Sequence, residues 1–179
     1  MERIGVIGKA KQWFENYLTG RLGSVKIDNI YSIKQKWDTG VPQGSKLGPI
    51  LYSIAVNELP RVISQFSKLK LYADDTVIMS GSKDIDLALN RLQNDFNIVQ
   101  KWSHDNNLII NCKKTKMLQI KKSGGQDMNL KIIFHEHECL HKIGQSCNCK
   151  KLVGMVEQHL YLGLTFDYTM SWNLHTQKL

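Results

Sequence analysis

The chain has 179 residues, of which 42% are hydrophobic and 22% are charged, a composition typical of one globular domain with a sizeable core. Its 24 Lys and Arg residues outnumber 16 Asp and Glu residues, and the resulting net charge of +8 favours a polyanionic partner. No apolar run approaches the roughly 20 residues of a membrane span, and the N-terminus lacks a signal-peptide core. We therefore expect an intracellular protein, nuclear or cytoplasmic rather than secreted, with no membrane partner.

The first third of the chain predicts two helices separated by short strands. Apolar and aromatic residues recur at helical spacing over 9–19. The stretch 24–33 predicts two short strands that turn at Asp28-Asn29. Residues 39–60 hold all three prolines, so we expect a loop that continues as a helix and ends at Pro60.

An acidic pair, Asp74-Asp75, interrupts a strand-like stretch in the middle of the chain. Residues 69–73 alternate between apolar and polar side chains and residues 77–79 are apolar, which predicts two strands with the pair at or near the hairpin tip. Adjacent carboxylates repel each other unless a cation compensates, and a divalent metal such as Mg²⁺ does so well. An ordinary turn is the alternative, because the dipeptide alone is a weak signal.

A long amphipathic helix is predicted after the acidic pair. Apolar residues repeat at steps of three and four over 85–102, and Ser82 or Asp84 is the expected cap. Strands are then predicted at 108–110 and 117–120, on either side of a basic turn. A polar, Gly-rich break follows, and a further strand is expected at 130–134.

A stretch rich in cysteine and histidine occupies residues 135–149. Thiolate and imidazole are good zinc ligands, so the stretch raises the hypothesis of a zinc site. Its ligands would be Cys139, His141, Cys147 and Cys149. The spacing differs from that of a standard zinc finger, because Cys-x-Cys replaces Cys-x-x-Cys. A plain β-hairpin insert is the simpler alternative.

Four segments of the chain follow one another in an order that closely resembles the palm of a reverse transcriptase. They are the loop GVPQGSKLGP at 40–49, the box YADDT at 72–76, the turn NCKKT at 111–115 and the strand YLGLTFD at 161–167. The resemblance is to the enzymes of non-LTR retrotransposons, LINE-like and jockey-like, and it extends from about residue 4 to residue 172. The loop and the box are long enough to make it specific.

The resemblance implies an α+β fold with an antiparallel palm sheet of polymerase type, helices packed on one face, and a partial thumb or connection at the C-terminus. Residues 1–122 would form a truncated palm, and residues 123–179 a β-hairpin insert followed by the palm-to-thumb segment. The implied activity is RNA-directed DNA polymerisation by a two-metal mechanism. The implied partners are an RNA template, a DNA primer and deoxynucleoside triphosphates, while the oligomeric state stays open.

The resemblance also implies catalytic residues. Asp74 and Asp75 would hold Mg²⁺ or Mn²⁺ on the rigid tip of the hairpin. Lys114 would approach the triphosphate and assist the departure of pyrophosphate. For Lys114 the alternative is a solvated basic turn, since Lys113 and Lys116 lie beside it.

Two further groups of residues are implied to contact the substrates. Those expected to contact the templating base, the primer end or the incoming nucleotide are Pro42, Gln43, Gly44, Tyr72 and Ala73. Those expected to grip the primer are Tyr161, Leu162 and Gly163. The alternatives are a strand aromatic for Tyr72 and core packing for Leu162.

One expected feature of this enzyme type does not appear in the sequence. Reverse transcriptases of this kind carry another metal-binding Asp in a palm strand ahead of the helix expected at 9–19, and residues 1–12 contain no Asp. We therefore expect an incomplete two-metal site, with turnover by this chain alone absent or severely impaired. The alternative function is a non-catalytic nucleic-acid-binding remnant or a domesticated protein.

Overall fold

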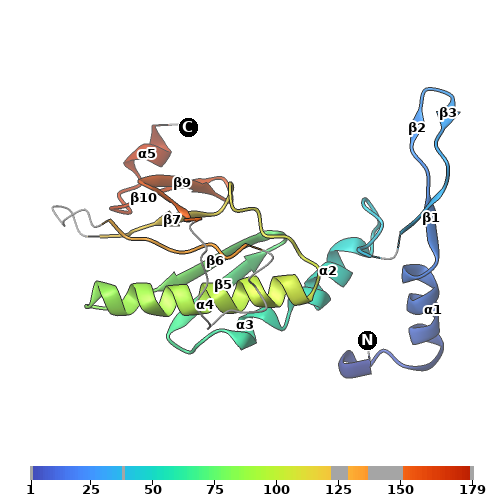
Figure 1. Cartoon of the computed structure of the whole chain (residues 1–179), viewed down its shortest axis with the longest axis horizontal. Helices are drawn as coiled ribbons and strands as arrows, with labels where there is room; N and C mark the ends of the chain where they lie inside the picture. Colours follow the sequence, from blue (N-terminus) through green and yellow to red (C-terminus); the bar gives the residue numbers. More distant parts are fainter. Residues whose placement is uncertain (1, 38, 122–128, 137–150, 178–179) are drawn as a thin grey trace. The chain divides into compact units, whose positions relative to one another are not determined.

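The computed structural model describes residues 2–37, 39–121, 129–136 and 151–177, and every structural statement below refers to them. The chain divides into two compact units, Met1–Asn57 and Glu58–Leu179, which we describe one at a time. Helices and strands alternate along both of them (Figure 1). This mixture confirms the expected helix-and-strand class, whereas the division predicted after residue 122 stays a prediction.

The first unit contains a short 3-10 helix, two α-helices and two antiparallel strand pairs nested one inside the other (Figure 1, blue to cyan). Its elements are the short 3-10 helix Glu2–Ile4, α1 (Gly8–Leu18), β1 (Arg21–Gly23), β2 (Lys26–Ile27), β3 (Ile30–Tyr31), β4 (Gln35–Trp37) and α2 (Gly48–Val56). β1 pairs with β4 and β2 with β3, both antiparallel. The predicted helix at 9–19 and the predicted strand pair around Asp28, whose φ is 52°, are confirmed.

Few side chains of the first unit are buried within the part of the chain that the structure describes. Helix α1 buries none, and its aromatic residues contact one another instead: the ring of Trp13 stacks on Tyr17 at 5.2 Å and meets Phe14 edge-on at 5.1 Å. The buried residues, Leu51 and Val56 among them, lie on α2. The apolar face of α1 therefore contributes little to the core of this unit.

The prolines of α2 and its neighbour correct one prediction. Pro49 lies in the first turn of α2, as expected. The helix ends at Val56, however, and Pro60 lies in the first turn of the next helix, α3 (Leu59–Val62). Proline is tolerated in a first turn because its missing N–H has no intrahelical acceptor there, so Pro60 begins a helix rather than ending one.

The second unit contains the longest helix and the longest strands. After α3 its elements are β5 (Ser67–Tyr72), β6 (Asp75–Ser80), α4 (Ile85–Asp105), β7 (Lys116–Leu118), β8 (Gly154–Val156), β9 (Gln158–Tyr161), β10 (Leu164–Asp167) and α5 (Asn173–Thr176). β5–β6 and β9–β10 are antiparallel hairpins, and β7 pairs with β8 in parallel. No helix in the described residues is long and apolar enough to cross a membrane.

The described strands form five two-stranded sheets, four antiparallel and one parallel, and the expected antiparallel palm sheet stays a prediction. Every strand except β5 and β6 has two to four residues, so each ladder offers few hydrogen bonds to a further strand. The core is held instead by packing against α4, which runs beside β5 and β6 (Figure 1).

Two clusters of buried apolar side chains lie against α4. The larger consists of Phe96, Met117, Ile132, Phe134 and Val153, and the smaller of Leu59, Leu69 and Val99. The rings of Phe96 and Phe134 meet edge-on at 5.9 Å. Apolar side chains from α3, the β5–β6 hairpin and the irregular segments thus pack on the apolar side of α4. This packing confirms the amphipathic pattern predicted for that helix.

The strand predicted at 130–134 is an extended segment with one isolated bridge, between Ile133 and Leu152. Two glutamine side chains of α4 also bond the backbone of this segment, at residues 133 and 135. Gln93 donates to the carbonyl of Ile133 at 3.1 Å and accepts from its N–H at 2.6 Å. Gln100 does the same for His135, at 3.0 and 3.3 Å. Side-chain amides therefore take the place of a neighbouring strand.

Hydrogen bonds close both ends of α4, from a side chain at its start and between backbone groups at its end. Asp84 accepts hydrogen bonds from the N–H groups of Asp86 and Leu87, which confirms one of the two expected caps. At the other end Asn107 has a φ of 56°, and the N–H of Leu108 bonds to the carbonyl of Ser103 at 2.7 Å. This turn leads into an irregular segment, so the strand predicted at 108–110 is wrong.

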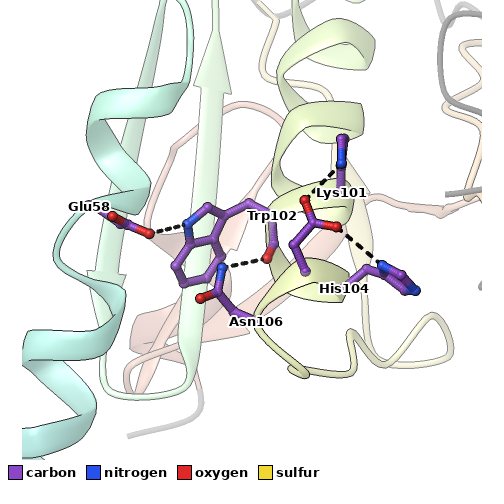
Figure 2. Close-up of polar contacts among 6 residues, drawn as sticks. Glu58, Lys101, Trp102, His104 and Asn106 are labelled. Carbon is purple, nitrogen blue, oxygen red and sulfur yellow. Dashed lines mark hydrogen bonds and ion pairs between the residues drawn. The ribbon is translucent and has the colours of Figure 1, made fainter. Parts of the chain in front are cut away.

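The last turn of α4 is also joined to the residue that precedes α3 (Figure 2). The indole N–H of Trp102 donates to the carboxylate of Glu58 at 2.9 Å, and the carbonyl of Trp102 accepts from the side chain of Asn106 at 2.9 Å. The carboxylate of Asp105 accepts from Lys101 at 2.8 Å, which lowers its pKa.

Candidate active site

The acidic pair lies at the tip of the β5–β6 hairpin. Tyr72 pairs with Asp75, so Ala73 and Asp74 form a two-residue turn and Asp75 is the first residue of β6. Of the two turn residues Ala73 alone has a positive φ, at 49°. A left-handed first residue followed by an ordinary second one is the pattern of a type II′ hairpin turn.

Both carboxylates at this tip are exposed and unpartnered. Within the described ranges no N–H, hydroxyl or cationic group bonds the carboxylate of Asp74 or that of Asp75. Ionised carboxylates are acceptors only, and such oxygens are the ligands that Mg²⁺ prefers together with water. The two residues therefore fit a hard divalent cation by their chemistry. No third His, Cys, Asp or Glu joins them in a metal-binding group among the residues that the structure describes.

The ring of Tyr72 lies next to the acidic pair and 64% of the residue is exposed. Tyr72 and Asp75 are directly opposite each other in the antiparallel register, so their side chains leave the hairpin on the same face. The other face packs against α4 through Leu69, Leu71 and Ile78. The hairpin thus offers a phenol and carboxylates on its open side.

The loop at 40–49 belongs to the first unit and contains a tight turn. The N–H of Ser45 bonds to the carbonyl of Pro42 at 3.2 Å, and Gly44, with a φ of 77°, occupies the third position of this turn. Only glycine adopts that φ without strain, which is typical of a type II turn. Gln43 and Gly44 are consequently exposed at its centre.

Two residues that we did not predict hold this loop in place. The guanidinium of Arg21 donates to the carbonyls of Leu18, Thr39 and Gly40, at 3.1, 3.0 and 2.8 Å. The hydroxyl of Ser45 accepts from the N–H of Gly48 at 3.0 Å. The position of Arg21 just after a helix end was the available signal, because cations there often bond the last carbonyls.

The turn that contains Lys114 is organised by the side chains on either side of it. The side-chain oxygen of Asn111 accepts from the N–H of Lys114 at 3.2 Å, and the hydroxyl of Thr115 donates to the carbonyl of Asn111 at 2.9 Å. The Asn and Thr of the motif thus shape the backbone, as side-chain to backbone bonds do in many turns. The Lys114 side chain is exposed.

The residues expected to grip the primer form a second tight hairpin turn. Tyr161 pairs with Leu164, and the two turn residues Leu162 and Gly163 have φ values of 50° and 80°. The ring of Tyr161 lies 6.4 Å from that of Phe166. Leu162 is 47% exposed, so core packing does not explain its presence in this turn.

A buried carboxylate that we did not predict closes the far end of this hairpin. Asp167 accepts hydrogen bonds from the N–H and hydroxyl of Thr169, at 2.7 and 2.6 Å, and from those of Ser171, at 3.3 and 3.0 Å. These bonds, led by the Thr169 hydroxyl, lower the pKa of Asp167 to about 2. The pattern Asp-x-Thr-x-Ser was the local signal for such a turn.

The structure brings three of the four predicted motifs into one unit. The acidic hairpin, the Lys114 turn and the Tyr161 hairpin all belong to the second unit, and the 40–49 loop belongs to the first. The residues predicted to bind zinc, Cys139, His141, Cys147 and Cys149, lie outside the described residues, as does the middle of the predicted hairpin insert.

Comparisons with known proteins match this set of motifs. The family model "Reverse transcriptase (RNA-dependent DNA polymerase)" matches residues 2–166. The RNA-directed DNA polymerase from mobile element jockey is 27% identical in Drosophila melanogaster, over 96% of this chain and 18% of the relative. Its counterpart in Drosophila funebris is 28% identical, over 98% of this chain and 19% of the relative.

A third relative is the probable RNA-directed DNA polymerase from transposon BS of Drosophila melanogaster, 33% identical over 62% of this chain and 14% of the relative. The chain spans about a fifth of the length of the two jockey proteins. No solved structure gives a significant match. Because the family model covers nearly the whole chain, the chain belongs to the reverse transcriptase family, and its relatives are the polymerases of non-LTR retrotransposons.

Proposed function

We propose that the β5–β6 hairpin is the metal-binding element of a reverse transcriptase palm, and that the chain takes part in RNA-templated DNA synthesis. The observation that carries this proposal is the pair of exposed, unpartnered carboxylates at the hairpin tip, one in the two-residue turn and one at the start of β6. The hairpin behind them is anchored by Leu69 in the core. A fixed pair of free carboxylates is what a metal site of this kind requires.

Asp74 and Asp75 would hold Mg²⁺ or Mn²⁺. When bound, these ions activate the primer 3′-hydroxyl and stabilise charge on the leaving pyrophosphate. The chain's own contribution is positional, because the packed strands limit how far the carboxylates move. The exposed ring of Tyr72, on the same face as Asp75, would contact the sugar or base at the primer end, beside Ala73.

The remaining motifs take supporting roles in this proposal. The exposed centre of the turn at Pro42, Gln43 and Gly44 would meet the templating base and incoming nucleotide. Lys114 would meet the triphosphate, since its side chain is exposed on a turn that Asn111 shapes. The hairpin with Tyr161, Leu162 and Gly163 would contact the primer.

Residues 1–122 would then be palm, and residues 123–179 an insert followed by a palm-to-thumb segment. The RNA template, DNA primer and deoxynucleoside triphosphates are the substrates of this proposal. The family describes RNA-dependent DNA polymerases, which act on a nucleic-acid template and nucleotides. The two-metal site would draw a further carboxylate from outside the described residues, because two side chains are few ligands for two ions.

Primer extension on an RNA template tests the proposal. The assay compares this chain and a longer chain extended upstream by an Asp-bearing strand, each with and without the Asp74→Ala/Asp75→Ala substitutions, with Mg²⁺ or Mn²⁺. We expect extension by the longer chain and its loss, by about three orders of magnitude, when both aspartates are replaced. Equal extension with and without the aspartates would contradict the role given to the hairpin.

A second candidate function is nucleic-acid binding without turnover. The net charge of +8 favours it, because a basic protein attracts nucleic acid. The hairpin tip also favours it, because two carboxylates are few ligands for two catalytic ions in the described residues. In the same assay this function predicts tight binding of the template–primer but no extension, even by the longer chain.

A further inference from the structure

Two lysines lie on the open face of the β5–β6 hairpin and have no role in the chemistry proposed above. Lys70 and Lys68 precede Tyr72 by two and four positions on β5. Residues two apart on a strand leave it on the same face, and Tyr72 shares its face with Asp75 across the hairpin. Both lysines therefore lie on the same face as the acidic turn.

The opposite face of the hairpin is occupied, and this one is open. Leu69, between the two lysines, is 8% exposed and belongs to a core cluster with Val99 of α4. Lys68 and Lys70 are exposed. Strands rise about 3.3 Å per residue, so the two lysines lie about 7 and 13 Å behind Tyr72 along β5.

The charges of these lysines are not neutralised within the protein. In the part of the chain that the structure describes, neither ammonium group forms an ion pair or a hydrogen bond. Lysines on an exposed strand commonly protect a sheet edge from pairing with another chain, and this is the competing explanation. Edge protection, however, does not explain why both lysines lie on the same face as the acidic turn.

We infer that Lys68 and Lys70 bind backbone phosphates of the nucleic-acid strand whose end reaches the Asp74-Asp75 turn. The inference deepens the proposed function and rests on it, because the acidic turn defines where the strand ends. The lysines attract phosphates along β5, and the acidic turn at the end of β5 is where the proposed function places the strand terminus. One strand of a duplex presents a phosphate about every 3.4 Å along the axis, so both lysines fall within a few linkages of the end.

The first test is the salt dependence of binding to an RNA–DNA hybrid with a recessed DNA 3′ end, followed by fluorescence anisotropy. The variant is Lys68→Ala/Lys70→Ala. Its matched control is Lys83→Ala/Lys101→Ala, which removes the same charge from the segment before α4 and from α4 itself, where Lys101 is exposed. We expect the variant to bind on the order of tenfold more weakly and its salt slope to fall by about two, whereas the control stays near the native chain.

The second test locates the contact on the strand. Neutral methylphosphonate linkages replace the second to fifth phosphates from the primer 3′ end. They should weaken binding by the native chain and leave the Lys68→Ala/Lys70→Ala variant almost unaffected, because the partner charges are already gone. A Lys68→Arg/Lys70→Arg variant keeps the charges and should respond as the native chain does. Circular dichroism confirms that each variant is folded.

The outcomes separate this inference from the proposed function. Equal losses in the variant and the control, or equal sensitivity of the variant to neutral linkages, overturn the inference and leave the polymerase proposal standing. Binding that depends on Lys68 and Lys70 without extension by the longer chain supports the inference and overturns the catalytic proposal. Absence of binding by the native chain overturns both.

Discussion

In the two hairpins of the second unit, β5–β6 and β9–β10, the first strand ends at a tyrosine and the turn has two residues, yet the turns differ. In β9–β10 both turn residues, Leu162 and Gly163, have positive φ, at 50° and 80°. In β5–β6 only Ala73 does, at 49°. The first pattern is that of a type I′ turn and the second that of a type II′ turn.

The difference explains how a carboxylate can occupy the tip of one hairpin. A type II′ turn requires a positive φ only at its first turn residue, which is Ala73. Asp74 is the second turn residue and therefore adopts an ordinary φ without strain. The conformational cost falls on Ala73 instead. In the other hairpin Gly163 carries the left-handed conformation that a side chain would resist.

The hairpins also differ in what stabilises them. The acidic hairpin has strands of six residues and packs on α4 through Leu69, whereas β9–β10 has strands of four residues and depends on the hydrogen bonds of Asp167. Apolar burial is insensitive to pH, and a carboxylate network is not. The two tips should therefore respond differently to core substitution, to acid and to changes in the turn.

The largest effect is expected from removing the core anchor of the acidic hairpin. Leu69→Ala should lower the free energy of unfolding by about 2–5 kcal/mol, because the side chain is buried in a packed cluster. Leu160→Ala is the matched substitution on β9, where the residue is 65% exposed, and should cost less than about 0.5 kcal/mol. Denaturant unfolding measures both, and equal costs would mean that the acidic hairpin is not held by the core.

Acid should act on β9–β10 more than on β5–β6. The pKa of Asp167 is lowered to about 2 in the folded chain from an ordinary 3.8, so its stabilisation is present above pH 3.8 and is lost as the pH falls towards 2. Amide hydrogen exchange between pH 2 and pH 5 should show β9–β10 losing protection first. In Asp167→Asn that difference in pH response between the hairpins should disappear, and its persistence would point to another group.

Removing the glycine from the second turn should give a smaller loss. Gly163→Ala is expected to cost about 1–2 kcal/mol through the left-handed φ alone, since no atom lies within 4 Å of an added Cβ. Gly81→Ala serves as the control, because its φ is not in that region and the space around it is equally open. Thermal unfolding distinguishes the two, and a similar response at both positions would contradict the turn assignment.

The smallest effect is expected from relieving the strain in the acidic turn. Ala73→Gly should raise the free energy of unfolding by about 0.5 kcal/mol, because the gain in the left-handed region slightly exceeds the entropy that glycine adds to the unfolded chain. Ala55→Gly in α2 should instead destabilise by about 1 kcal/mol. A loss at Ala73 as large as that at Ala55 would show that the turn is not strained.

Much of the local structure was predictable from sequence patterns, because its causes lie within a few residues. The spacing of apolar residues predicted α4, and Asp84 was one of its two expected caps. Alternation over 69–73 and the apolar run at 77–79 predicted the acidic hairpin. Positional rules were less reliable at Pro60, where a proline that suits either the end of one helix or the start of the next proved to start α3.

Contacts between distant segments were not predictable in this way. Nothing near residues 130–136 indicates that Gln93 and Gln100 would bond their backbone, since the partners are 35 to 40 positions apart. The attachment of the 40–49 loop by Arg21 spans 18 and 19 positions. The catalytic roles of Asp74, Lys114 and the other motif residues stay predictions, because they concern substrates rather than contacts within the chain.

The sequence by itself determined the family of this protein, the positions of its motifs and the place of the acidic pair at a hairpin tip, because these depend on residue identity at short spacing. Only the tertiary structure decided which face of the hairpin is open, and with it that Lys68 and Lys70 share that face with Tyr72 and Asp75. Alternation divides a strand into two faces, but burial of Leu69 against α4 is what leaves the lysine face exposed to a partner.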